Sequence, residues 1–227
     1  MSAKSLEAKS CIVCGASVRL LEDTLTYQDI PVQYAICDHC ELITKTPASH
    51  PSNKAEKAQY ETHENGMDNT GYINYLSRFA ETAVDPFIKQ GRGLDFGSGP
   101  GPVLYELLKQ KGFIMEHYDP FYHPDKSYQN KHFDLITTTE VFEHLKHPKE
   151  TFEHLIKRLR PKGILAIQTE FHPNNDQVLL DWWYRRDYTH ITFYTVQTFN
   201  YLSTVFPVKM IYSNDKNIVV FQKEVNP

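Results

Sequence analysis

The chain has 227 residues, of which 41% are hydrophobic and 23% charged, and its formal net charge at pH 7 is -4. This length suffices for one α/β core and a small accessory module, while the apolar runs fall short of the roughly 20 residues of a membrane span, and residues 1–10 lack the apolar stretch of a secretory signal. We therefore expect a cytoplasmic protein with no membrane partner, and the acidic charge, without a cluster of Lys and Arg, argues against nucleic acid as a partner.

The first 46 residues contain all four cysteines, as two Cys-x-x-Cys pairs with 22 residues between them. Thiols stay reduced in the cytoplasm, and each pair brings two thiolates within reach of one tetrahedral ion. The pattern predicts a zinc ribbon over residues 1–46, with a structural zinc ion bound by Cys11, Cys14, Cys37 and Cys40. His39 stays an alternative ligand, because Glu41 rather than glycine follows the second pair.

Residues 47–70 are expected to form a linker and an N-terminal cap. The stretch 47–59 is polar and contains prolines, as linkers often do. Three residues before the first predicted helix are candidates for closing over a bound ligand: Tyr60, His63 and Asn65.

Residues 71–227 alternate strand-like and helix-like segments, which predicts an α/β domain with a mostly parallel, Rossmann-like sheet. The expected strands are 93–96, 113–119, 133–140 and 164–170, and the expected helices carry apolar residues on one face and cover 71–84, 103–108, 148–160 and 195–206. Two final strands, 208–215 and 217–224, predict an antiparallel hairpin. Because few residues separate Asp119 from Phe133, the third strand of the sheet is expected to be short or absent.

A glycine-rich turn, Gly97-Ser98-Gly99-Pro100-Gly101, follows the first of these strands. Glycines let the backbone turn tightly and approach a ligand closely. The G-x-G-x-G spacing differs from the G-x-G-x-x-G of dinucleotide-binding proteins, which disfavours a nicotinamide-dependent oxidoreductase. Asp119 ends the next strand, where a carboxylate accepts hydrogen bonds from both hydroxyls of an adenosine ribose. Together, the turn and Asp119 predict a site for an adenosine-containing cofactor.

From about residue 71 onward the chain resembles the class I S-adenosylmethionine-dependent methyltransferases. The resemblance rests on LDFGSGPG at 94–101, YDP at 118–120, FDLITTTEVFEHL at 133–145, LRPKGILAIQT at 159–169 and THITFYT at 189–195. It implies S-adenosylmethionine as cofactor, with its methionyl part at the glycine turn and its ribose at Asp119. In this resemblance Asp95 braces the turn, Pro120 lies near the adenine and Glu140 faces the cofactor, so the implied cofactor-binding residues are Asp95, Gly97, Ser98, Gly99, Asp119, Pro120 and Glu140.

The segment from Asp181 to His190 follows the expected strand 164–170 and is the richest candidate for the substrate side. In a parallel sheet, loops at the carboxyl ends of strands form the ligand crevice. His190 is a candidate general base because its ordinary pKa lies near neutrality, Asp187 is a candidate to orient it, and Arg185 or Arg186 is a candidate to hold an anionic group. The competing interpretation is structural, with His190 capping local backbone. We also expect Glu143 and His144 to be structural.

The predicted function is S-adenosylmethionine-dependent methyl transfer to a small-molecule, sugar-linked acceptor. The cysteine pairs ahead of the domain are similar to those of zinc-bearing methyltransferases that act on sugars and other small metabolites, and distantly to those of some ribosomal RNA methyltransferases. Two alternatives stay open. The chain is an RNA methyltransferase whose zinc ribbon docks on nucleic acid, or it is a non-catalytic module that binds the cofactor or a protein partner.

Overall fold

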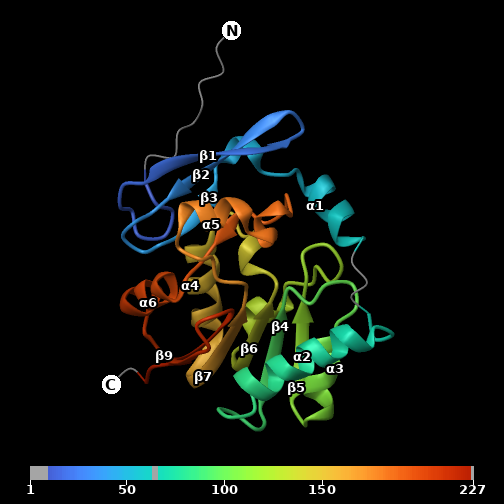
Figure 1. Ribbon diagram of the computed structural model, residues 1–227. Coiled ribbons are helices and arrows are strands. Elements are labelled where there is room, and N and C mark those ends of the chain that lie inside the picture. The colour runs from blue at the N-terminus through green and yellow to red at the C-terminus, as the bar shows by residue number, and fades with distance from the viewer. Residues whose placement is uncertain (1–9, 63–65, 226–227) are drawn as a thin grey trace.

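The computed structural model describes residues 10–62 and 66–225, so His63 and Asn65 lie outside the described residues. Its larger sheet has six strands in the order β5-β4-β6-β7-β10-β9 (Figure 1). Four of them run parallel: β4 (Arg92–Phe96), β5 (Ile114–Tyr118), β6 (Phe133–Thr139) and β7 (Leu159–Gln168). The last two, β9 (Val208–Ser213) and β10 (Ile218–Lys223), form an antiparallel hairpin at one edge. The predicted mostly parallel sheet is confirmed.

The segment between β5 and β6 is described throughout and adds no strand to this sheet, in agreement with its short length. It contains one 3-10 helix, η2 (Ser127–Asn130). The α-helices of the domain are α2 (Thr70–Ala83), α3 (Val103–Gln110), α4 (Pro148–Arg158), α5 (Asp176–Asp181) and α6 (Val196–Val205).

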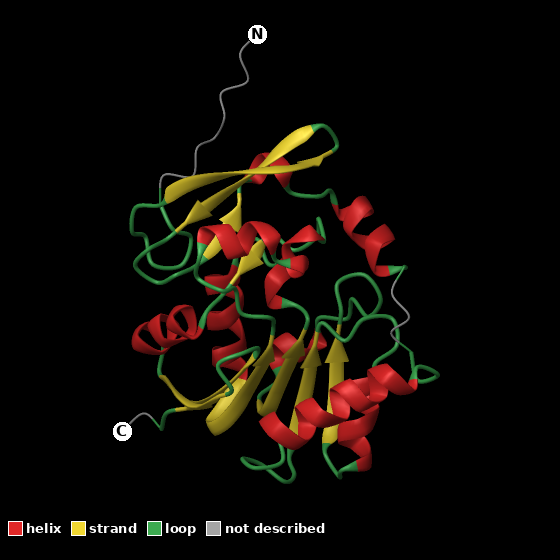
Figure 2. Cartoon of the chain, in the orientation of Figure 1, coloured by secondary structure: helices red, strands yellow, loops and turns green. Residues whose placement is uncertain are grey.

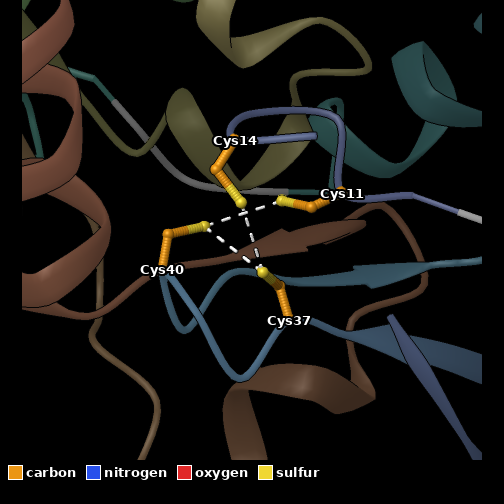
Figure 3. Close-up of side chains that lie close together, drawn as sticks. All are labelled: Cys11, Cys14, Cys37 and Cys40. Atoms are coloured by element: carbon orange, nitrogen blue, oxygen red, sulfur yellow. Dashed lines mark hydrogen bonds between the residues drawn. The ribbon is translucent and has the colours of Figure 1, made fainter. Parts of the chain in front are cut away.

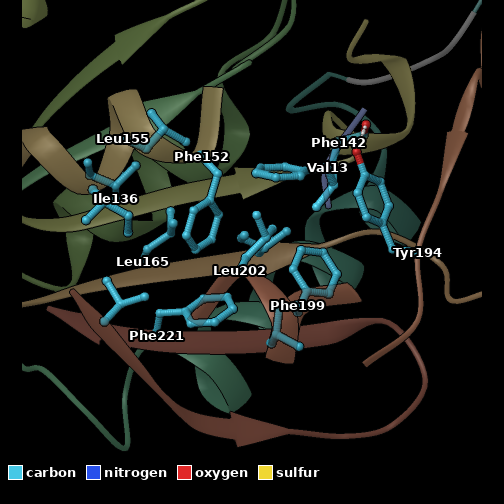
Figure 4. Close-up of a cluster of buried hydrophobic side chains, with 14 of the residues drawn as sticks. Val13, Ile136, Phe142, Phe152, Leu155, Leu165, Tyr194, Phe199, Leu202 and Phe221 are labelled. Atoms are coloured by element: carbon cyan, nitrogen blue, oxygen red, sulfur yellow. Dashed lines mark hydrogen bonds between the residues drawn. The ribbon is translucent and has the colours of Figure 1, made fainter. Parts of the chain in front are cut away.

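Alternate residues along the strands point to opposite faces of the sheet, and each face is covered by different helices. On one face, Leu135 of β6 packs in a cluster with Leu76 of α2 and Leu104 of α3. On the other face, its neighbour Ile136 belongs to the cluster that contains Phe152 of α4 and Leu202 of α6 (Figure 4). This three-layer arrangement buries the sheet on both sides.

A second, four-stranded antiparallel sheet lies at the carboxyl ends of the parallel strands (Figure 2). Its strands are β1 (Arg19–Tyr27), β2 (Ile30–Ile36), β3 (Ile43–Lys45) and β8 (Thr192–Phe193). Because β8 comes from the far end of the chain, the sheet joins the cysteine-containing region to the larger domain. Val13 also packs in the cluster of Phe142 and Tyr194 (Figure 4). The two regions therefore share one core, and the domain division at residue 46 stays a prediction.

The expected linker contains helical structure, namely the 3-10 helix η1 (Pro47–Ser49) and the helix α1 (Asn53–Tyr60). Ser52 caps α1 by accepting a hydrogen bond from the amide of Ala55 at 3.3 Å. The helix buries none of its residues, so it has no apolar face that would indicate a helix in the sequence. None of the helices in the described part of the chain combines the length and the hydropathy needed to span a membrane.

Candidate active site

The glycine turn between β4 and α3 is tied to the end of the neighbouring strand β5. The backbone amides of Gly97 and Ser98 donate hydrogen bonds to the carbonyl of Tyr118, at 2.7 and 3.1 Å. Gly97 has a φ of +82°, and a Cβ atom there would lie 2.2 Å from Cγ2 of Val141, so only glycine fits. The amides of Gly97 and Ser98 are thus used within the protein and are not directed at a ligand.

Asp119 lies directly after β5 and closes over the same turn. Its Oδ2 accepts a hydrogen bond from the amide of Gly99 at 3.0 Å, and its Oδ1 accepts from the amides of Phe121 and Tyr122, at 2.8 and 3.1 Å. A carboxylate offers about four acceptor positions. Three hydrogen bonds therefore orient Asp119 and still leave it able to accept one from a ligand.

A cavity of about 490 Å³ lies beside the turn, at the carboxyl ends of the parallel strands. This volume is in the usual range for small-molecule sites. The cavity brings together most of the residues predicted for the cofactor and for catalysis: Gly97, Ser98, Gly99, Asp119, Pro120, Glu140, Asp187 and His190.

Two features of the cavity wall fit the cofactor that the resemblance implies. Ser98 lines the cavity, and its hydroxyl oxygen is buried and has no hydrogen-bond partner among the described residues. A Cβ atom on Gly99 would meet nothing within 4 Å, so the wall leaves space at this point. An unpaired buried hydroxyl costs free energy, and a polar ligand would relieve that cost.

Asp95 is the one predicted cofactor residue that does not line the cavity. Its side chain is buried beneath the turn, where Oδ1 accepts a hydrogen bond from the hydroxyl of Thr137 at 3.0 Å. Burial raises the pKa of Asp95 to about 7, despite that hydrogen bond. Asp95 is thus placed to support the turn from below. Because it does not line the cavity, its side chain would not contact a cofactor bound there.

The fully buried Glu143 and the half-buried Glu140 are joined by Tyr184. The hydroxyl of Tyr184 lies 3.0 Å from Oε2 of Glu140 and 2.7 Å from Oε1 of Glu143. Tyr75 donates a further hydrogen bond to Glu140 at 2.7 Å, and Thr169 donates one to Glu143 at 2.8 Å. Burial, together with the nearby charge of Glu143, raises the pKa of Glu140 to about 8, and burial also raises the pKa of Glu143. Sequence reasoning placed only Glu140 in the site.

His190 lies at the same end of the cavity and contacts His144, with ring centroids 4.9 Å apart. Its Nδ1 donates a hydrogen bond to the carbonyl of Tyr184 at 2.8 Å. Burial and the neighbouring His144 lower the pKa of His190 to about 3, so the imidazole is neutral at pH 7. Both interpretations of His190 therefore find support, since it bonds local backbone and also lines the cavity.

Asp187 does not hold His190 in the way the sequence suggested. The closest approach joins Nε2 of His190 and Oδ2 of Asp187 at 4.0 Å, beyond hydrogen-bond distance. Asp187 instead accepts hydrogen bonds from the amide and hydroxyl of Thr189, at 2.8 and 2.6 Å. Arg185 is also occupied, because its buried guanidinium contacts Asp23 and the carbonyl of Leu180. The contact of Arg185 with Asp23 could not be read from the sequence, because Asp23 lies 162 residues earlier, on β1.

The helix α1 contributes Glu56 and Tyr60 to the cavity wall. Tyr60 was named from the sequence as a candidate for closing over a bound ligand, but Glu56 was not identified. The ring of Tyr60 packs edge-on against His144, with centroids 5.1 Å apart, and its hydroxyl donates a hydrogen bond to Glu56 at 2.8 Å. Across the cavity, Trp183 also lines the wall although its side chain is 65% exposed. The cavity is thus bordered by segments outside the parallel sheet.

The four cysteines converge on one point between the two regions of the chain (Figure 3). Their sulfur atoms are 3.6 Å apart for Cys11 and Cys40, 3.4 Å for Cys14 and Cys37, and 3.7 Å for Cys37 and Cys40. Four thiolates around zinc at about 2.3 Å have sulfur atoms about 3.8 Å apart, so the geometry suits a tetrahedral ion. His39 is not part of the cluster and packs against Tyr201, with ring centroids 5.6 Å apart.

Glu41 takes the left-handed backbone conformation after the second cysteine pair, with a φ of +60°, as Gly15 does after the first with +77°. This conformation is unfavourable for a residue with a side chain. Two contacts hold it: the carbonyl of Glu41 accepts a hydrogen bond from His172 at 2.7 Å, and its carboxylate accepts one from Thr195 at 2.7 Å. Glu41 therefore replaces a glycine at this turn and links it to the larger domain.

Comparison with solved structures gives matches among methyltransferases. An O-methyltransferase family protein from Burkholderia thailandensis matches with a TM-score of 0.51 and 11% identity, over 76% of this chain and 64% of that one. The N-methyltransferase NodS from Bradyrhizobium japonicum matches with a TM-score of 0.47 and 14% identity, over 70% of this chain and 99% of that one. A coclaurine N-methyltransferase bound to N-methylheliamine and SAH matches with a TM-score of 0.42 and 17% identity, over 66% of this chain and 53% of that one. No curated protein matches the chain.

The family model described as a methyltransferase domain matches residues 68–203, which is more than half of the chain. The matched segment contains the glycine turn, Asp119, Glu140 and His190, and therefore most of the cavity wall described above. The protein therefore belongs to the methyltransferase domain family, as a class I S-adenosylmethionine-dependent methyltransferase.

Proposed function

We propose that the acceptor of the methyl group is a small, uncharged, sugar-linked molecule that binds at the Glu140 end of the cavity. The observation that carries this proposal is the charge of the wall. Among the described residues that line the cavity there is no Lys or Arg, while four carboxyl groups face it: Glu56, Asp119, Glu140 and Asp187. A phosphate group would be repelled there, because nothing in the wall offsets its charge.

The two ends of the cavity suit two different ligands. Ser98 and Asp119 would hold the cofactor at one end, where bound S-adenosylmethionine supplies an activated methyl group on a sulfonium. At the other end, Glu140, Tyr184 and His190 offer hydrogen-bonding groups to a polar acceptor. The walls formed by α1 and Trp183 would restrict water from the space between the ends. Aligning donor and acceptor in this way is the main contribution such a protein makes to the displacement.

We also infer a structural role for zinc at the cysteine cluster. Four thiolates close the coordination sphere, so no position is left for an activated water. The cluster lies where β2, β3 and the larger domain meet, since Cys40 accepts a hydrogen bond at its carbonyl from Thr198 at 2.8 Å. The four free cysteines would stay reduced in the cytoplasm, where we expect the protein to be located.

The proposal is tested by incubating the protein with S-adenosylmethionine that carries a labelled methyl group. Neutral sugars and glycosides, phosphorylated sugars, and total RNA are offered as separate acceptor pools. We expect label in the neutral pool and none above background in RNA. Label that enters RNA alone would contradict the small-molecule acceptor and favour the RNA alternative. Tight binding of cofactor without transfer to any pool would favour the non-catalytic alternative.

A further inference from the structure

Three side chains, two of which line the acceptor end of the cavity while the third is buried behind it, present potential metal ligands to one another. They are Glu143 and His144, from the 3-10 helix η3 (Phe142–His144), and His190, from the loop before β8. One ligand atom from each residue lies within 4.8 Å of the others. Ligands that share an ion at about 2.1 Å are roughly 3 to 4 Å apart, so small side-chain rotations would close the group around a cation.

The two imidazoles are oriented as metal ligands usually are. Nδ1 of His144 donates a hydrogen bond to the carbonyl of Thr189 at 3.0 Å, and Nδ1 of His190 donates one to the carbonyl of Tyr184 at 2.8 Å. A neutral imidazole that donates from Nδ1 carries its lone pair on Nε2. Carbonyl partners of this kind commonly fix the ring orientation of metal-binding histidines.

No hydrogen bond to Nε2 of either histidine is present within residues 10–62 and 66–225. The contacts of these atoms are with carboxylate oxygens, 3.8 Å away on Glu143 for His144 and 4.0 Å away on Asp187 for His190. The side chain of Glu143 is fully buried, and that of His190 is 10% exposed. Two imidazole lone pairs without a donor thus lie beside the Glu143 carboxylate, whose oxygens accept hydrogen bonds from Tyr184 and Thr169 and keep further acceptor positions.

The charge of this end of the cavity also calls for a cation. Glu143 is fully buried next to the half-buried Glu140, and the ammonium of Lys45 donates its hydrogen bonds to the carbonyls of Arg185 and Asp187. No Lys or Arg among the described residues forms an ion pair with either carboxyl group. A divalent ion among them would supply the missing charge.

We propose that Glu143, His144 and His190 bind one divalent transition-metal ion, which holds a hydroxyl oxygen of the acceptor. Two imidazoles and one carboxylate are a common ligand set for such ions. This inference rests on the proposed function, because it identifies the acceptor atom of that same site as oxygen. It also gives His190 the role of a metal ligand in place of a general base.

The chemistry follows from the charge of the ion. A hydroxyl bound to a divalent ion loses its proton more readily, and here the proton leaves to solvent water. The acceptor oxygen then uses a lone pair to form the new bond to the methyl carbon. The bond from that carbon to sulfur breaks, and its electron pair stays on sulfur, so the sulfonium becomes a neutral thioether. The products are a methyl ether, the thioether and one proton.

The site is tested by titrating the full chain with Mn²⁺ and following the signal of the free ion by electron paramagnetic resonance. Mn²⁺ is the suitable probe because it prefers oxygen and nitrogen ligands, whereas the cysteine cluster favours softer ions. We expect one Mn²⁺ per chain in wild-type protein. His144→Ala and His190→Ala should each weaken binding by about 10- to 100-fold or more. His147→Ala is the matched control, since this exposed histidine lies three residues from His144 and outside the cavity.

Two further measurements separate the possible failures. Circular dichroism and binding of S-adenosylhomocysteine show whether each variant is folded, and the conservative variant His144→Gln is used where alanine unfolds the protein. Wild-type protein that binds S-adenosylhomocysteine but no Mn²⁺, or equal Mn²⁺ affinity in wild type and both folded histidine variants, would overturn the metal site and leave the proposed function standing. Failure to bind S-adenosylhomocysteine would instead count against the function itself.

Discussion

The carboxylate of Asp119 accepts a hydrogen bond from the backbone amide of Gly99 at 3.0 Å. The two halves of the sequence pattern, the glycine turn and the acidic end of the next strand, are thus joined directly. Because Phe121 and Tyr122 also donate to this carboxylate, its position is set before a cofactor binds. The geometry makes Asp119 the most direct point at which to test cofactor binding.

Replacing Asp119 with alanine should weaken binding of S-adenosylhomocysteine by about 1.5 to 3 kcal/mol for each lost hydrogen bond to the charged carboxylate. Isothermal titration calorimetry measures this difference. Asp125→Ala is the control, because this carboxylate lies six residues away on the surface and outside the cavity wall. Equal affinity in Asp119→Ala and wild type would remove Asp119 from the site.

Cys37→Ser should abolish zinc binding and lower the thermal stability of the protein. Since Cys37, Val13 and Phe142 belong to one core cluster, we expect the destabilisation to extend into the larger domain. Metal analysis and thermal unfolding followed by circular dichroism measure the two effects. His39→Ala should retain the zinc, because His39 packs against Tyr201 outside the cluster. Zinc lost from His39→Ala and kept by Cys37→Ser would contradict the assigned ligands.

The parallel sheet could be predicted from the sequence because its strands are buried on both faces. Leu135 and Ile136, for example, are both fully buried although they point to opposite sides, which produces continuous apolar runs between turn signals. The glycine turn and Asp119 were readable for a similar reason, since local backbone geometry requires those residue types.

The acceptor end of the cavity depends on contacts that the sequence does not encode locally. His144 is oriented by the carbonyl of Thr189, which is 45 residues away in the chain. Glu143 reads as an ordinary structural residue until Tyr184 and Thr169 are placed beside it. The helix α1 was missed because it buries none of its residues. These features follow from tertiary packing, which spacing alone cannot reveal.

Asp95 should make a contribution to the free energy of unfolding that falls as the pH rises from about 4 to 7, whereas buried histidines such as His190, whose pKa is lowered, contribute in the opposite direction. The carboxyl group of Asp95 has an ordinary pKa of 3.8, which burial raises to about 7 in the folded protein. The folded state therefore binds an extra proton in this interval, and raising the pH favours the unfolded state. Glu140, with a pKa raised to about 8, extends the effect upward.

Asp95→Asn is expected to flatten this pH dependence, because the amide stays uncharged and can still accept the hydrogen bond from Thr137. Urea denaturation at pH 5 and pH 8 measures the difference. Glu153→Gln serves as the control, since this exposed carboxylate pairs only with Lys157 among the described residues. A pH dependence of equal slope in Asp95→Asn and wild type would contradict the raised pKa.

His190→Ala should lower the rate of methyl transfer by about 10²- to 10⁴-fold, the usual contribution of a group that assists removal of the acceptor's proton, here by holding the metal ion that binds the acceptor. Binding of S-adenosylhomocysteine should change little, because its main contacts lie at Ser98 and Asp119. Asp187→Asn should have a much smaller effect on turnover, since Asp187 lies 4.0 Å from His190 and accepts its hydrogen bonds from Thr189 and Gln59. Unchanged turnover in His190→Ala would exclude His190 from the chemistry, and a loss of stability alone would support its structural interpretation.

The central claim is that the cavity beside the glycine turn holds the cofactor. A crystal structure of the full chain grown with S-adenosylhomocysteine tests it most directly. We predict that the ligand lies against Ser98 and Gly99, with a ribose hydroxyl hydrogen-bonded to Asp119 and its sulfur directed toward Glu140. Density for the ligand elsewhere on the protein, or its absence at a concentration that saturates binding in solution, would contradict the account.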